Sequence, residues 1–149
     1  MDSLSKRILA EKENVEKALT NLEKALKRKR KTTIELAAIG TFLHNIYSGI
    51  ENILKQILKE KNIKVSKSES WHKDLLNLSV TNKIISLNLS DELYEYLTFR
   101  HFFVHAYGFM LVEDHLKDLA ENISRIWSEF VLEIKNFITT EENNGLQES

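Results

Sequence analysis

Apolar side chains recur every three or four residues in Ile46-Tyr-Ser-Gly-Ile-Glu-Asn-Ile-Leu-Lys-Gln-Ile57, which is the spacing of one face of an α-helix. The pattern begins upstream near Thr33, where Thr32 or Thr33 can serve as the N-cap. Its apolar face is wider than those of the other helices that the sequence predicts. We therefore expect this helix at the centre of the fold.

Further helices are expected around it. Apolar spacing predicts long helices at about 5–28 and 112–138, and a short helix at 71–78 after a polar loop. Ser90, with Asp91 and Glu92 after it, has the pattern of an N-cap that opens another helix. The chain has no proline and four glycines, so turn signals between strands are lacking. The expected fold is all-α, an antiparallel bundle of four main helices plus a short helix.

The length of the chain predicts a single domain, and its composition indicates a protein that does not span a membrane. We expect the bundle to occupy residues 1–138, and residues 139–149 to form a flexible tail because they lack apolar content. Without cysteine the chain has neither disulfides nor a thiolate metal site. No apolar run approaches the roughly 20 residues that cross a bilayer. The start of the chain is charged and lacks a secretory hydrophobic region, so a cytoplasmic protein without a membrane partner is expected.

The segment Arg100-His-Phe-Phe-Val-His-Ala-Tyr107 carries a guanidinium, two imidazoles and a phenol. Arginine holds phosphate through paired donors, and histidine titrates near neutral pH. On a straight α-helix Arg100 and His105 point about 140° apart, whereas His101 and His105 share a face. The face of Arg100 and the face of the two histidines can converge on one phosphate if Gly108 or a local distortion bends the helix. They can also do so if a second copy of the chain supplies the facing groups.

The R-x4-H-x-Y spacing of Arg100, His105 and Tyr107 resembles the signature of the HEPN superfamily, and more narrowly that of HepT-type toxins. Two other segments are similar to this family in the same order. Tyr47-Ser-Gly-Ile-Glu-Asn-Ile-Leu-Lys55 resembles its second-helix segment, and Trp71-His-Lys-Asp-Leu-Leu76 resembles its short tryptophan-histidine turn before a helix. The resemblance reaches from about residue 33 to residue 137, which is most of the chain.

The resemblance implies a homodimeric ribonuclease toxin of a toxin-antitoxin system, with two motifs facing one another across a cleft. RNA would be cut by transphosphorylation without a metal or a cofactor. His105 is the expected general acid or base, and Arg100 is expected to stabilise charge on the phosphoryl oxygens. The resemblance also implies that a cognate MntA-like nucleotidyltransferase antitoxin adenylylates Tyr107. Glu51 and His101 are candidate supporting residues.

Other interpretations of the same residues stay open. His101 is read as a core histidine, Glu51 equally well as an exposed ion-pair partner of Lys55, and the Trp71-His72 turn as an anchor for the short helix. His44 carries no functional signal. The chain can also be a non-catalytic nucleotide- or substrate-binding subunit of a nucleotidyltransferase.

A third function is that of a structural helical dimer whose basic first helix binds an acidic partner. Residues 1–31 carry ten Lys/Arg against five Asp/Glu, with the local maximum at Lys27-Arg-Lys-Arg-Lys31. Such a run can contact RNA phosphates, but it also complements the negative end of the first helix. We favour the second interpretation because no aromatic side chains interleave the run to stack on bases.

Overall fold

The computed structural model describes residues 2–29, 31–107 and 113–148, and all of its regular structure in these ranges is helical. The elements are α1 (Asp2–Leu26), α2 (Thr33–Glu60), α3 (Trp71–Thr81), α4 (Leu87–Phe102), the π-helix η1 (Phe103–Tyr107) and α5 (Glu113–Glu148). The prediction of an all-α chain is confirmed. No described helix combines the length and the apolar character that crossing a bilayer requires.

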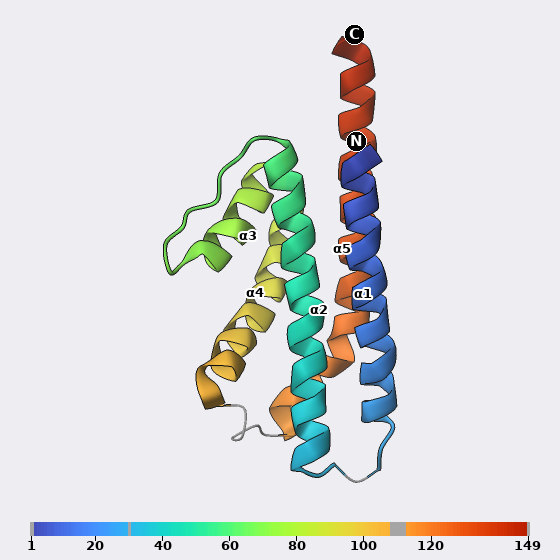
Figure 1. Cartoon of the computed structure of the whole chain (residues 1–149), viewed down its shortest axis with the longest axis vertical. Helices are drawn as coiled ribbons and strands as arrows, with labels where there is room; N and C mark the ends of the chain where they lie inside the picture. Colours follow the sequence, from blue (N-terminus) through green and yellow to red (C-terminus); the bar gives the residue numbers. More distant parts are fainter. Residues whose placement is uncertain (1, 30, 108–112, 149) are drawn as a thin grey trace.

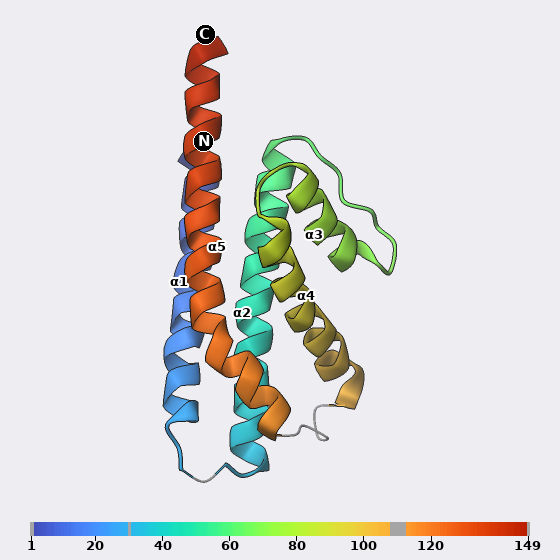
Figure 2. The same ribbon diagram turned by 180° about the vertical axis from the view of Figure 1, so that it is seen from behind.

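α2 lies between two groups of helices (Figures 1 and 2). α1 and α5 run along one side of it, and α3 and α4 cover the other side. α2 contacts each of these four helices, as its wide apolar face predicted. Its fully buried side chains include Leu43, Ile46, Ile50 and Leu54, which form the middle of the hydrophobic core.

The start of α2 is held by a capping box, which confirms Thr32 as the N-cap of the two candidates. The Thr32 hydroxyl accepts a hydrogen bond from the Ile34 backbone N–H at 3.2 Å. In return the Glu35 carboxylate accepts from the Thr32 backbone N–H at 2.8 Å. The Thr32 hydrogen bonds lower the pKa of Glu35, so the cap stays charged well below neutral pH.

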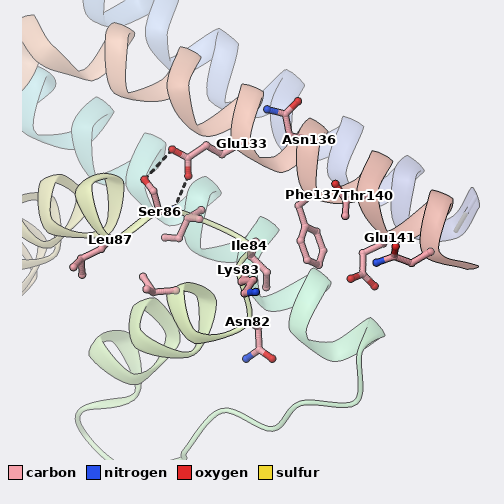
Figure 3. A pocket seen from close by; sticks show the side chains of 13 residues that line it. Asn82, Lys83, Ile84, Ser86, Leu87, Glu133, Asn136, Phe137, Thr140 and Glu141 are labelled. Carbon is pink, nitrogen blue, oxygen red and sulfur yellow. Dashed lines mark hydrogen bonds between the residues drawn. The ribbon is translucent and has the colours of Figure 1, made fainter.

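α4, the helix that leads into the arginine and histidine motif, begins four residues earlier than predicted. Ser86 is its N-cap, and the hydroxyl of Ser86 accepts from the Leu89 backbone N–H at 3.1 Å. The Ser90 side chain lies inside the helix and is buried. The reason is tertiary: the Glu133 carboxylate of α5 accepts hydrogen bonds from the backbone N–H and the hydroxyl of Ser86, at 2.6 and 2.9 Å (Figure 3).

A hollow of about 720 Å³ opens beside this cap (Figure 3). It is lined by the connection from α3 to α4 and by the C-terminal half of α5. Because it lies where α4 begins, it is at the opposite end of that helix from the motif. The hollow therefore belongs to the attachment of α4 to α5 and not to the candidate site.

The segment at 139–149, predicted to be a flexible tail, is helical as far as Glu148 because α5 continues through it. Lys61 from the end of α2 forms an ion pair with Glu141 at 3.0 Å, and its ammonium lies 5.4 Å from the centre of the Phe137 ring. Propagating a packed helix costs little, so a polar sequence can extend it. The flexibility of this end stays a prediction.

The close approach of α1 and α2 depends on Gly49. A Cβ atom at this position would lie 2.3 Å from Cγ2 of Val15, which is buried and rotamer-restricted. Gly49→Ala is therefore expected to lower the free energy of unfolding by about 1–2 kcal/mol, since overpacking outweighs the gain in helix propensity. Gly145→Ala is the matched control, because nothing lies within 4 Å of a Cβ there. Urea denaturation measures both, and an unchanged or raised stability for Gly49→Ala would contradict this packing.

Candidate functional site

The motif lies at the C-terminal end of α4 and in η1. Arg100 is in the last turn of α4, and His105 is in η1, where the hydrogen-bond pattern widens from i→i+4 to i→i+5. A wider turn rotates less per residue, so Arg100 and His105 are closer in direction than the about 140° of a straight α-helix. The structure thus contains a local distortion of the kind that the sequence analysis left open. Gly108 lies outside the described residues.

Arg100 points toward α3 and is half-buried. Its Nη1 lies 3.4 Å from Nε2 of His72, at the long end of hydrogen-bonding distance. Its Nε is buried and has no hydrogen-bond partner among the described residues. One contact therefore orients the Arg100 guanidinium, and its other N–H groups remain available to bind a ligand.

His72 also binds Glu51, a carboxylate in the core. Its Nδ1 lies 2.7 Å from Oε2 of Glu51, whose residue is only 3% exposed. Since a carboxylate accepts hydrogen bonds, Nδ1 carries a proton, and in the neutral ring Nε2 is then free to accept from Arg100. One residue from each of α2, α3 and α4 thus forms a continuous Glu51–His72–Arg100 chain.

The imidazole ring of His72 packs against Trp71, which in turn contacts Lys55. The Trp71 ring stacks on it with centroids 3.5 Å apart and an interplanar angle of 30°. The ammonium of Lys55 lies 3.8 Å from the centre of the Trp71 ring, a cation–π contact. Lys55 therefore contacts Trp71, and Glu51 binds His72. The exposed ion pair between Glu51 and Lys55, which the sequence left open, is not formed.

The half-buried His44 and the buried Tyr47 of α2 lie beside this chain and remain neutral at neutral pH. Burial, followed by the positive charge of Arg100, lowers the pKa of His44. Burial also raises the pKa of Tyr47, and the nearby Glu51 carboxylate reinforces the shift. The Tyr47 hydroxyl is nevertheless not within full hydrogen-bond geometry of any described residue. Glu51 and Arg100 are therefore the charged ends of the site.

The other face of the motif is open to solvent. His101 and His105 are both exposed, and their ring centroids lie 4.2 Å apart. Val104 and Phe102 beside them are 46% and 37% exposed. Phe103 turns inward, where it packs on Phe99 and on the ring of His44. His105 is therefore accessible to a large substrate.

The candidate residues fall into two groups. Glu51 and Arg100 meet through His72, while His101 and His105 meet each other on the exposed side. Among the described residues no hydrogen bond joins the two groups. The Tyr107 side chain lies outside the described residues. In the described ranges no cluster of three histidine, cysteine or acidic side chains could hold a metal ion.

Sequence reasoning missed the contacts of His72 with Glu51 and Arg100, and the contact of His44 with Phe103 of the motif segment. His72 was expected only to anchor the short helix, and it is separated from Glu51 by 21 residues and from Arg100 by 28. No spacing rule connects residues so far apart on different helices. The available signal was the similarity of the Trp71-His72 turn to a family segment.

The Glu51–His72 contact makes a testable contribution to stability. His72→Leu is expected to lower the free energy of unfolding by about 3–5 kcal/mol, because it leaves a carboxylate buried without a partner. The double variant Glu51→Leu/His72→Leu should recover most of that loss, since two apolar side chains replace both polar groups. Urea denaturation of the two variants and the parent measures the difference. Equal losses in the single and double variants would mean that the two side chains are not coupled.

Comparison with known proteins agrees with this architecture. The family model described as HepT-like protein matches residues 38–141, which include α3, α4 and the motif. Among solved structures, YutE from Bacillus subtilis, a cytosolic protein of unknown function, is similar with a TM-score of 0.62 and 18% identity. The alignment covers 87% of this chain and 92% of that chain, and at this identity it shows the fold. No curated protein matches. Because the family model spans well over half of the sequence, this chain belongs to the HepT-like family.

Proposed function

We propose that this chain is the toxin of a toxin-antitoxin system and acts as a metal-independent endoribonuclease on cytoplasmic RNA. Membership of the HepT-like family supports a toxin-like protein of the HEPN type. The observation that carries the proposal is the motif itself. An accessible His105 lies five residues from an arginine whose guanidinium is oriented by the Glu51–His72–Arg100 chain.

The reaction would be transphosphorylation. The ribose 2′-oxygen forms a bond to the adjacent phosphorus, the bond to the 5′-oxygen breaks, and a cyclic phosphate remains. His105 removes the proton from the 2′-hydroxyl or returns one to the departing 5′-oxygen, and such transfer contributes about 10²- to 10⁴-fold in rate. Arg100 offsets the negative charge that grows on the phosphoryl oxygens. DNA lacks the 2′-hydroxyl, so only RNA can react this way.

A second copy of the chain would complete the site. Within one chain Arg100 and His105 belong to separate groups of contacts, so a facing motif is the simplest way to surround a phosphate. The surface beside the motif supports this arrangement. Phe102, Val104 and Tyr94 are exposed, and a largely apolar hollow of about 500 Å³ adjoins Phe102. We infer a symmetric homodimer that pairs these surfaces.

The proposal predicts that inducing the chain alone in a bacterial host arrests growth and degrades RNA. His105→Ala and Arg100→Ala should each abolish both effects at matched expression, with cleavage rates reduced about 10²- to 10⁴-fold. Arg125→Ala is the matched control, because Arg125 pairs with Glu92 and Glu129 on the surface of α4 and α5. Growth curves and total RNA on a gel are the measurements.

Each outcome selects a function. Arrest by the parent and the control but not by the motif variants supports the toxin. Healthy growth and intact RNA from every variant, with no adenylate on the purified chain, would favour the nucleotide- or substrate-binding subunit of a nucleotidyltransferase. If Arg100→Ala leaves both growth arrest and nucleotide binding unchanged, neither function holds, and a structural dimer remains.

We also propose that a cognate MntA-like nucleotidyltransferase neutralises this chain by adenylylating Tyr107. The added phosphate and base would place negative charge and bulk next to Arg100 and His105 in the sequence, and both would exclude a substrate phosphate. The partner plus ATP should add the mass of adenylate to the parent but not to Tyr107→Phe. Tyr94→Phe, which alters an exposed tyrosine of α4, should be modified like the parent. Intact-mass spectrometry measures the addition, and adenylate on Tyr107→Phe would place the modification elsewhere.

A further inference from the structure

We propose that Glu51 and His72 form a positioning pair that holds the Arg100 guanidinium for phosphate. The inference rests on the proposed ribonuclease function and adds to it. It starts from the two contacts of one ring, Nδ1 to Glu51 at 2.7 Å and Nε2 to Arg100 at 3.4 Å. Neither Glu51 nor His72 is placed among the reacting groups.

The burial of Glu51 argues against a purely structural pair. Removing a carboxylate from water costs several kcal/mol, and replacing a buried ion pair by apolar side chains of similar volume is often neutral or stabilising. Glu51 nevertheless lies at 3% exposure within the apolar core of α2, between Ile50 and Ile53 in sequence. Leucine at both positions would hold α3 against α2 equally well. What the polar pair adds, compared with two leucines, is the contact of His72 with Arg100.

The orientation of the ring explains how the pair acts. With the Nδ1 proton donated to Glu51, the lone pair of Nε2 accepts a hydrogen bond from Arg100. A catalytic arginine needs fixed geometry, because an electrostatic contribution falls when donors have to reorganise during the reaction.

His72 is a positioning residue and not a second catalytic histidine. Its side chain is 17% exposed, its ring is covered by Trp71, and its Nε2 faces the guanidinium. His105 on the exposed side is the group with access to RNA. Loss of His72 should therefore act through the placement of Arg100, which changes the rate of the chemical step more than the affinity for RNA.

The first test examines the two contacts of His72 without any RNA. The ring nitrogen resonances of the histidines are recorded by NMR at one pH in the full chain, in Arg100→Gln and in Glu51→Gln. Arg100→Gln should shift the Nε2 resonance of His72, and Glu51→Gln should shift its Nδ1 resonance, because each variant changes the group in contact with that atom. The ring resonances of His101 on the exposed face should be alike in the parent and in Glu51→Gln. An unchanged Nε2 resonance of His72 in Arg100→Gln would overturn the proposal.

The second test separates positioning from folding. Glu51→Leu/His72→Leu is expected to keep the fold but lose the acceptor for Arg100. Its kcat for RNA cleavage should fall about tenfold or more, with a smaller change in KM. His72→Gln, whose side-chain oxygen can accept from Arg100, should recover part of kcat. Glu92→Leu/Arg125→Leu removes a surface ion pair of α4 and α5 and is the matched control.

The two proposals fail in different ways. If the parent does not cleave RNA at any concentration, the ribonuclease function is wrong, and the NMR resonances of His72 alone decide whether Glu51 and His72 hold Arg100. If the parent cleaves RNA and the stably folded double leucine variant cleaves it equally well, the positioning role is wrong, while the ribonuclease function stands.

Discussion

A carboxylate in the core of the central helix needs a partner, and the partner of Glu51 is His72 at the start of α3. The 2.7 Å contact with His72 ties the first turn of α3 to the middle of α2, and stacking on Trp71 with Lys55 beyond it leaves the imidazole little freedom to turn. The second nitrogen of the ring then meets Arg100 of α4. Two polar contacts of one imidazole ring thus link three consecutive helices.

Under the proposed function, the two chemical roles of the motif fall in two different environments. Arg100 lies against the interior, where a guanidinium would interact more strongly with a phosphate than it would in water. His105 lies in the exposed π-helical turn, where a substrate in solution would reach it. The change from α- to π-helix falls between them. A regular α-helix would point the two side chains further apart, so the distortion is the local feature that brings both tasks to one end of α4.

The fold could be predicted from sequence wherever the information was local. Apolar spacing identified the helices and the central position of α2, and the threonine and glutamate of its capping box are three residues apart. The start of α4 could not be chosen locally, because Ser86 and Ser90 both precede helix-compatible sequence and only Glu133 of α5 distinguishes them. The helical end of α5 was missed for a similar reason, since its polar residues continue a helix nucleated by packing elsewhere.

The same distinction applies to the site. Arg100, His101 and His105 could be found because they lie on one segment, whereas His72 could be connected with them only by packing of α3 onto α2 and α4. Under the proposed function, residues that take no part in the reaction can still affect its rate. Trp71 and Lys55 touch neither Arg100 nor His105 in the described contacts, yet they hold the ring against which Arg100 rests. Any change that shifts α3 by a fraction of an ångström is therefore transmitted to the guanidinium through a contact already at the limit of hydrogen-bonding distance.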